Sequence, residues 1–156
     1  MKGTVHYEVR DGVALLTVDN PPVNPLSEGV RNGLYEGIAK AEADSEVVGV
    51  VLTGKGRAFI AGADISEFGG NPSGHSLNEV FRSLEYCSKP LVAAINGITL
   101  GGGLETALCC NYRIASKEAF VGLPEVNLGL LPGGGGTQRL PRLTGPAEAL
   151  KMMLTG

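Results

Sequence analysis

Short apolar runs, each bounded by turn-forming residues, set the pattern of this chain. We expect strands at these runs, because they are rich in residues that fill buried strands. The expected strands cover residues 13–18 (VALLTV), 47–52 (VVGVVL), 91–95 (LVAAI), 112–115 and 120–123, and residues 57–65 are expected to form a short strand that turns into a loop.

Helical periodicity occurs between these runs. Ser27 and Glu28 suit the start of a helix, since a serine caps the first turn and a carboxylate suits its positive end. Apolar residues then follow at near-helical spacing, at Val30, Leu34, Ile38 and Ala41. Ser76 and Glu79 have the spacing of a capping box at the start of a second helix. Further helices are expected at residues 104–110 and 146–154.

The alternation of apolar strands with helices predicts an α/β fold whose strands are buried on both faces. Residues 66–74 are expected to form an exposed loop, because the breaker-rich run GGNPSG occupies residues 69–74. No internal repeat or domain boundary is evident in the 156 residues, so we expect one domain over residues 1–156.

Composition and charge argue against several classes of function. The net charge is −3, which argues against a nucleic-acid partner. No apolar run approaches the ~18 residues of a membrane span, and the polar N-terminus is unlike a secretory signal. The three cysteines, Cys87, Cys109 and Cys110, do not resemble a disulfide framework or a zinc site and are expected to be small apolar filler.

Two kinds of catalytic site are poorly supported. His6 and His75 have no G-x-S-x-G serine and no well-placed cysteine partner in the sequence, which disfavours a hydrolase triad. The run Gly133 to Gly136 lacks the Lys-Ser/Thr pair of a phosphate-binding loop. A flexible turn before Leu140 is the simpler interpretation of these glycines.

Two carboxylates are the strongest candidates for chemistry. Glu105 follows a glycine triplet and Glu125 follows Leu123-Pro124, each in apolar surroundings. Such a setting raises the free energy of an ionised carboxylate, which is how acid–base residues are tuned. Judged from the sequence context alone, the alternative is that neither residue is catalytic. Glu105 would then be a glutamate at the start of a helix, and Glu125 would be a glutamate in an exposed turn.

Residues with little or no side chain, whose backbone amides are accessible, occur in two stretches of the sequence. An amide at Gly102 can approach a ligand closely because the residue has no side chain, and Ala61-Gly62-Ala63 forms a second small-residue turn. Two such amides could form an oxyanion hole. Tight packing of a strand against a helix would require the same small residues, and this alternative stays open.

Taken together, these stretches resemble the enoyl-CoA hydratase/isomerase (crotonase) family, most closely the hydratase part of multifunctional fatty-acid β-oxidation enzymes. The matching stretches, in family order, are residues 20–24 (NPPVN), 57–65 (RAFIAGADI), 89–97 (KPLVAAING), 101–105 (GGGLE) and 123–140 (LPEVNLGLLPGGGGTQRL). The resemblance implies a crotonase-like spiral of β-β-α turns that lacks the family's usual C-terminal helical part.

The resemblance also implies roles for individual residues. Glu105 and Glu125 match the two catalytic glutamates of hydratases, and Ala63 and Gly102 match the amides of the oxyanion hole. The substrate-binding positions it implies are Ala61, Asp64 and Ile65, on the loop that contacts CoA, and Gly133, on the loop that lines the acyl site.

By the same resemblance, the expected reaction is hydration of a trans-2-enoyl-CoA in fatty-acid β-oxidation. The alternatives are another acyl-CoA reaction, such as Δ3-Δ2 isomerisation or thioester hydrolysis, and an inactive acyl-CoA-binding module. The expected substrate is an acyl-CoA, with no metal, no other cofactor and no membrane partner. A homo-oligomer or attachment to a 3-hydroxyacyl-CoA dehydrogenase part is expected, in the cytoplasm or, in a eukaryote, the peroxisome.

Overall fold

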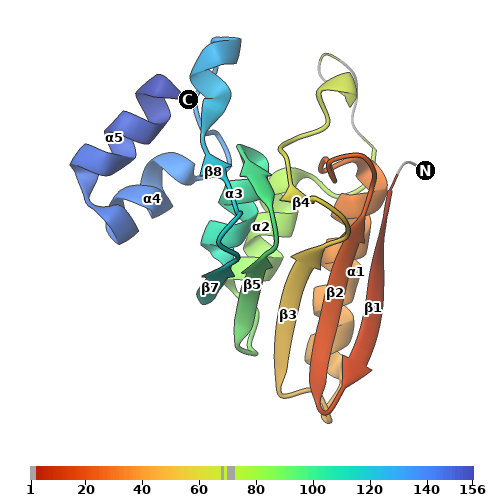
Figure 1. The fold of residues 1–156 in the computed structure, drawn as a ribbon. Helices are drawn as coiled ribbons and strands as arrows, with labels where there is room; N and C mark the ends of the chain where they lie inside the picture. The colour runs from red at the N-terminus through yellow and green to blue at the C-terminus, as the bar shows by residue number, and fades with distance from the viewer. Residues whose placement is uncertain (1–2, 68, 70–72) are drawn as a thin grey trace.

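Two sheets form the framework of the protein (Figure 1), in a computed structural model that describes residues 3–67, 69 and 73–156. The larger sheet has the strand order β1-β2-β3-β5-β7, and the smaller has the order β4-β6-β8. β1 and β2 pair antiparallel and all other neighbours pair parallel. The strands are β1 (Thr4–Arg10), β2 (Val13–Asp19), β3 (Gly49–Gly54), β4 (Ala58–Ile60), β5 (Leu91–Ile95), β6 (Ile98–Leu100), β7 (Tyr112–Ala115) and β8 (Val121–Gly122).

The helices follow one another across these sheets. α1 packs on β1 and β2, α2 packs on α1, and α3 lies between α2 and α4. α4 and α5 pack on each other, on the opposite side of the molecule from β1 (Figure 1). The helices are α1 (Glu28–Ala43), α2 (Leu77–Glu85), α3 (Gly102–Cys109), α4 (Gly136–Thr144) and α5 (Pro146–Thr155), with 3₁₀ turns η1 (Ile65–Glu67) and η2 (Pro124–Leu128).

Most of the predicted elements are confirmed. The strands at residues 91–95 and 112–115 have the predicted bounds, and the capping box of Ser76 and Glu79 is present at the start of α2. The strand expected at 47–52 begins instead at Gly49, and the one expected at 120–123 is reduced to β8. Of the predicted loop at 66–74, residues 68 and 70–72 lie outside the described residues.

The glycine run before Leu140 forms a turn at residues 133–135, as expected, but its last glycine, Gly136, already begins α4. The prediction of burial on both faces is wrong, because β2 and β3 alternate buried with half-buried residues. On the edge strand β7, Tyr112 and Ile114 are 66% and 68% exposed. Apolar side chains occupy both faces of this sheet, so composition could not distinguish the covered face from the open one.

The buried residues form two clusters of unequal size. The larger joins the covered face of the main sheet to α1 and α2, and it includes Cys109 and Cys110, which confirms their role as small apolar residues. The three cysteines are free. The smaller cluster lies under α4 and α5 and consists of Leu104, Leu108, Leu123, Leu140 and Ala149.

Candidate active site

Close backbone packing carries Glu105 into the interior. The helix α3 lies so near β4 that a Cβ atom on Gly103 would come 1.8 Å from the carbonyl oxygen of Ile60. Only glycine permits this approach. Glu105, in the first turn of that helix, is 4% exposed, and its Oε1 accepts a hydrogen bond from the Gly136 N–H at 2.8 Å. The carboxylate is therefore buried and held by a segment 31 residues away.

Glu125 lies in η2, which a left-handed Gly129 terminates. A Cβ atom on Gly101 would lie 3.0 Å from Glu125 Oε1, so the glycine before α3 makes room for this carboxylate. Its other oxygen, Oε2, is buried and has no hydrogen-bond partner among the described residues. An unpaired buried carboxylate oxygen is energetically costly, and such exceptions concentrate at functional sites.

Burial sets the electrostatics of both glutamates. It raises the pKa of Glu105 above its usual value, and the negative charge of Glu125 raises it further, against the lowering effect of the Gly136 N–H. Burial also raises the pKa of Glu125. A raised pKa favours the protonated form of each carboxyl, and carboxyls tuned in this way are typical of acid–base residues.

The two predicted amides are close neighbours. A Cβ atom on Gly102 would lie 3.6 Å from the backbone nitrogen of Ala63. Gly102 is the first residue of α3, where backbone N–H groups have no intrahelical partner. Ala63 forms an isolated parallel bridge with Leu26, which fixes its loop against the start of α1. The backbone of a loop and the N-terminus of a helix thus lie next to each other at Ala63 and Gly102.

One cavity of about 280 Å³ brings most of the predicted residues together. Of the predicted residues, its lining includes Ala61, Ala63, Ile65, Gly102, Glu105, Glu125 and Gly133. Apolar side chains complete the wall, among them Leu77, Leu100, Leu128, Leu130 and Leu131. Asp64 lies instead in an adjacent cavity of about 340 Å³ that shares Ala63 and Gly133 with the first.

Sequence reasoning missed the residues that hold Glu105. Cβ atoms on Gly134 and Gly136 would lie 2.4 Å from its Oε2 and 3.0 Å from its Oε1. Arg139 donates to the Gly134 carbonyl at 2.7 Å and pairs with Glu85 of α2. The glycine run was visible in the sequence, but its partner could be found only once α3 and α4 were packed together.

The other candidate residues lie elsewhere. His6 contacts Asp19, and His75 stacks on Tyr35 with ring centroids 3.7 Å apart. Neither histidine lines the cavity that contains the glutamates. Within residues 3–67, 69 and 73–156, no group of three or more His, Cys, Asp or Glu side chains could hold a metal ion.

Comparison with known proteins identifies the family. Residues 8–156 match the enoyl-CoA hydratase/isomerase family. The chain belongs to this family. The sequence is 50% identical to a peroxisomal bifunctional enzyme of Danio rerio over 151 residues, which are 96% of this chain and 21% of that protein. It is 46% identical to a probable enoyl-CoA hydratase of Bacillus subtilis over 92% of this chain and 58% of that one.

Solved structures of the family have the same fold. An enoyl-CoA hydratase from Bacillus anthracis superposes with a TM-score of 0.87 at 35% identity, covering 100% of this chain and 63% of that one. An enoyl-CoA hydratase/isomerase from Pseudoalteromonas atlantica gives 0.91 at 29% identity, covering 98% and 62%. The predicted α/β crotonase-type fold is therefore confirmed. The chain spans about a fifth of the bifunctional relative and about three fifths of these structures.

Proposed function

We propose that this chain hydrates a trans-2-enoyl-CoA, adding water across the 2,3 double bond in fatty-acid β-oxidation. One observation carries the proposal: Glu105, Glu125, Ala63 and Gly102 line a single largely apolar cavity. The family membership supports the same reaction.

The amides stabilise charge in this scheme. The thioester oxygen lies between the N–H groups of Ala63 and Gly102 and becomes negative as water attacks C3. A preorganised donor of this kind typically contributes about 3 kcal/mol of transition-state stabilisation. Because both donors are backbone groups in a buried site, they need no rearrangement when the charge develops.

The carboxylates manage the water and its proton. Glu105, held through Oε1 by the Gly136 N–H, orients the water together with Glu125. The water oxygen forms the bond to C3 and gives a proton to the carboxylate pair, and Glu125 delivers a proton to C2 of the enolate. The unpartnered Oε2 of Glu125 is free for this transfer.

The remaining predicted residues bind the substrate. Ala61, Asp64 and Ile65 contact the CoA portion, and Ile65 both lines the cavity and is exposed to solvent. Gly133 lines the acyl side, where the leucines of the wall suit a hydrocarbon chain. Chemistry then occurs at the junction between the polar CoA portion and the apolar acyl group.

Isomerisation is the second candidate activity. Moving a double bond from C3 to C2 requires one carboxylate to carry a proton between C4 and C2. Glu125 has the unpartnered oxygen that such a carrier needs. We therefore propose Δ3-Δ2 isomerase activity as a side reaction that depends on Glu125 alone.

Replacing each glutamate tests the scheme. Glu125→Gln should lower turnover of a trans-2-enoyl-CoA by about 10²–10⁴-fold, the usual contribution of an acid–base group, while CoA-ester affinity measured by calorimetry stays within about threefold. The assay follows the loss of absorbance of the conjugated thioester. Glu118→Gln, at an exposed carboxylate, is the control and should retain full activity.

The two activities separate in the same experiment. Glu105→Gln should lose hydration but keep isomerisation of a trans-3-enoyl-CoA, whereas Glu125→Gln should lose both. Unchanged hydration in Glu125→Gln would discard the mechanism. Binding of the CoA ester without any turnover would favour the inactive binding module, and release of free CoA would favour thioester hydrolysis.

The proposal also includes a dehydrogenase part attached to this domain and the compartment in which the protein acts. Attachment to a 3-hydroxyacyl-CoA dehydrogenase part is consistent with relatives named bifunctional and about five times as long. A peroxisomal site in a eukaryote is consistent with the names of the same relatives. None of the described helices has the length and hydropathy that a bilayer crossing requires. The single domain over residues 1–156, the absence of a cofactor and the formation of an oligomer stay predictions.

A further inference from the structure

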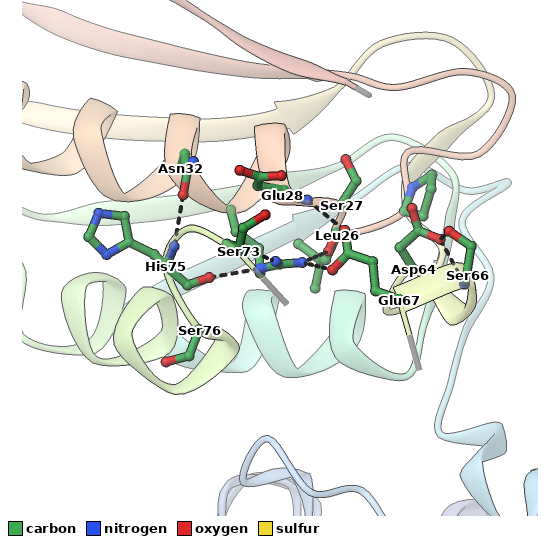
Figure 2. Close-up of polar contacts among 12 residues, drawn as sticks. Leu26, Ser27, Glu28, Asn32, Asp64, Ser66, Glu67, Ser73, His75 and Ser76 are labelled. Atoms are coloured by element: carbon green, nitrogen blue, oxygen red, sulfur yellow. Dashed lines mark hydrogen bonds and ion pairs between the residues drawn. The ribbon is translucent and has the colours of Figure 1, made fainter. Parts of the chain in front are cut away.

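Arg31 of α1 is a buried arginine near the loop of Ala61–Ala63, and its partners Leu26, Glu67, Ser73 and His75 are labelled in Figure 2. The side chain of Arg31 is 5% exposed. Its Nη1 donates to the Leu26 carbonyl at 2.8 Å and to Glu67 Oε2 at 2.6 Å. Its Nε and Nη2 donate to the carbonyls of His75 and Ser73 at 2.7 and 3.0 Å. One guanidinium therefore joins three carbonyls, from the two segments that precede α1 and α2, to one carboxylate.

Glu67 extends this network to the start of α1. It lies at the end of η1, two residues after Ile65, and its Oε1 accepts the Glu28 N–H at 2.9 Å. Ser27 occupies the N-cap position, but its side chain makes no capping bond to the helix. Glu67 thus satisfies an N–H of the first helical turn, and the Arg31–Glu67 pair ties η1 to α1.

The same network fixes the plane of the peptide between Gly62 and Ala63. The Leu26 N–H donates to the Gly62 carbonyl oxygen at 2.9 Å. In a planar trans peptide the C=O and the following N–H point in opposite directions, so this bond turns the Ala63 N–H away from α1. Within the described residues the Ala63 N–H has no acceptor, which leaves it available to a ligand.

We propose that Arg31 is the positioning residue of the oxyanion hole: it holds Leu26, which bridges Ala63, and Glu67, four residues after Ala63, and so aims the Ala63 N–H into the cavity. This inference rests on the proposed function. Arginine suits the task because its planar fork serves several acceptors at once, which a lysine ammonium cannot match in this geometry. Removing it would take away the arginine donor of Glu67 Oε2 and of three carbonyls, all of them at least partly buried.

A lysine substitution tests the role against a matched control. Arg31→Lys keeps the charge and loses the fork. Arg113→Lys makes the same change at an arginine that donates to the Ala107 and Cys110 carbonyls, at the end of α3 away from the cavity. Both variants lose backbone hydrogen bonds, so a purely structural role predicts a loss of thermal stability in each, larger for the more buried Arg31, and little effect on kcat from either.

Two readouts separate positioning from folding. For hydration of a trans-2-enoyl-CoA, Arg31→Lys should lower kcat by roughly 10- to 100-fold, the effect of misplacing a catalytic group by about 1 Å, with KM within about threefold. The second readout is the red shift of a bound amino-substituted cinnamoyl-CoA, which reports polarisation of the thioester carbonyl. Arg31→Lys should lose most of this shift and Arg113→Lys should keep it.

Glu67→Gln carries the test if Arg31→Lys does not fold. It keeps the backbone contacts of Arg31 and weakens only the link to η1, so we expect a smaller loss of kcat and of the red shift. Wild-type kcat and red shift in the folded variants would overturn the inference. If the unaltered protein gives neither turnover nor red shift, the proposed function fails; if it gives both and Arg31→Lys matches it, only the role of Arg31 fails.

Discussion

The two regions that meet at the cavity are built very differently. The main sheet with α1 and α2 encloses the large buried cluster, whereas α4 and α5 pack over a cluster of five residues, two of which belong to α3. Leucines of the second region are widely exposed, with Leu131 at 67% and Leu143 at 54%. The first region orients the Ala63 amide through backbone hydrogen bonds, and the second supplies the glycine loop that holds Glu105.

This difference separates two requirements of the site. The Ala63 amide must keep its orientation, and it lies beside the large core. The carboxylates must be buried yet free to exchange protons, and they lie where the two regions join. We infer that catalytic geometry depends on how α4 docks on α3, through the Gly136 N–H and Glu105 Oε1, as much as on the core itself.

The largest expected effect compares the two cores directly. Leu16, fully buried, packs so tightly against α1 that a Cβ on Gly37 would lie 2.2 Å from its Cδ2. Leu16→Ala should cost about 3–5 kcal/mol of unfolding free energy. Leu140→Ala, in the small cluster, should cost about 2 kcal/mol because its exposed surroundings can collapse. Urea unfolding measures both, and equal costs would break the distinction between the regions.

A second prediction concerns the docking of the regions. Alanine at Gly134 would place a Cβ 2.4 Å from Glu105 Oε2 and 2.3 Å from Phe81 Cε2. Gly134→Ala should therefore displace the carboxylate and lower kcat about 100-fold, near 2.7 kcal/mol. Gly49→Ala, in the main sheet, meets its nearest atom at 3.4 Å and is the control. If both variants kept full turnover, the glycine loop would have no part in holding Glu105.

The smallest effect is a difference in pH dependence. Burial raises the pKa of Glu125, so the neutral form is favoured in the folded state and stability falls as pH rises through the folded pKa. The Glu125→Gln variant has no ionisable carboxyl at this position, so its stability does not fall in this way. Its unfolding free energy relative to wild type should therefore increase between pH 4 and 8, by about 1.4 kcal/mol for each unit by which the pKa is raised.

Glu85 should behave in the opposite way. Hydrogen bonds from Arg139 lower the pKa of Glu85, so its contribution is present above the ordinary glutamate pKa and is lost as pH falls. Glu85→Gln should lose stability relative to wild type as pH rises, by a small amount because the pair is partly exposed. If the unfolding free energies of both variants, relative to wild type, changed with pH in the same direction, the opposite pKa shifts of Glu125 and Glu85 would be contradicted.

Local pattern predicted the elements whose causes are local. The strand at residues 91–95 is a continuous apolar run, and the capping box of Ser76 and Glu79 acts within one turn. β6 and α4 were not predicted, because they depend on contacts with distant segments. β6 has three residues between glycines, and α4 begins in a glycine run and contains Pro141, which local propensity disfavours in a helix. Packing against neighbouring elements overrides those preferences.

The sequence by itself determined the family, the succession of strands and helices, and the residue types that the chemistry needs: two glutamates in apolar stretches and small residues at two turns. Only the tertiary structure decided that these residues share a cavity, that Oε2 of Glu125 has no partner, and that Arg31 and Arg139 hold the loops around them. The reason is physical. Periodicity and capping act over a few residues, whereas burial, pKa and the direction of an amide depend on segments that only the fold brings together.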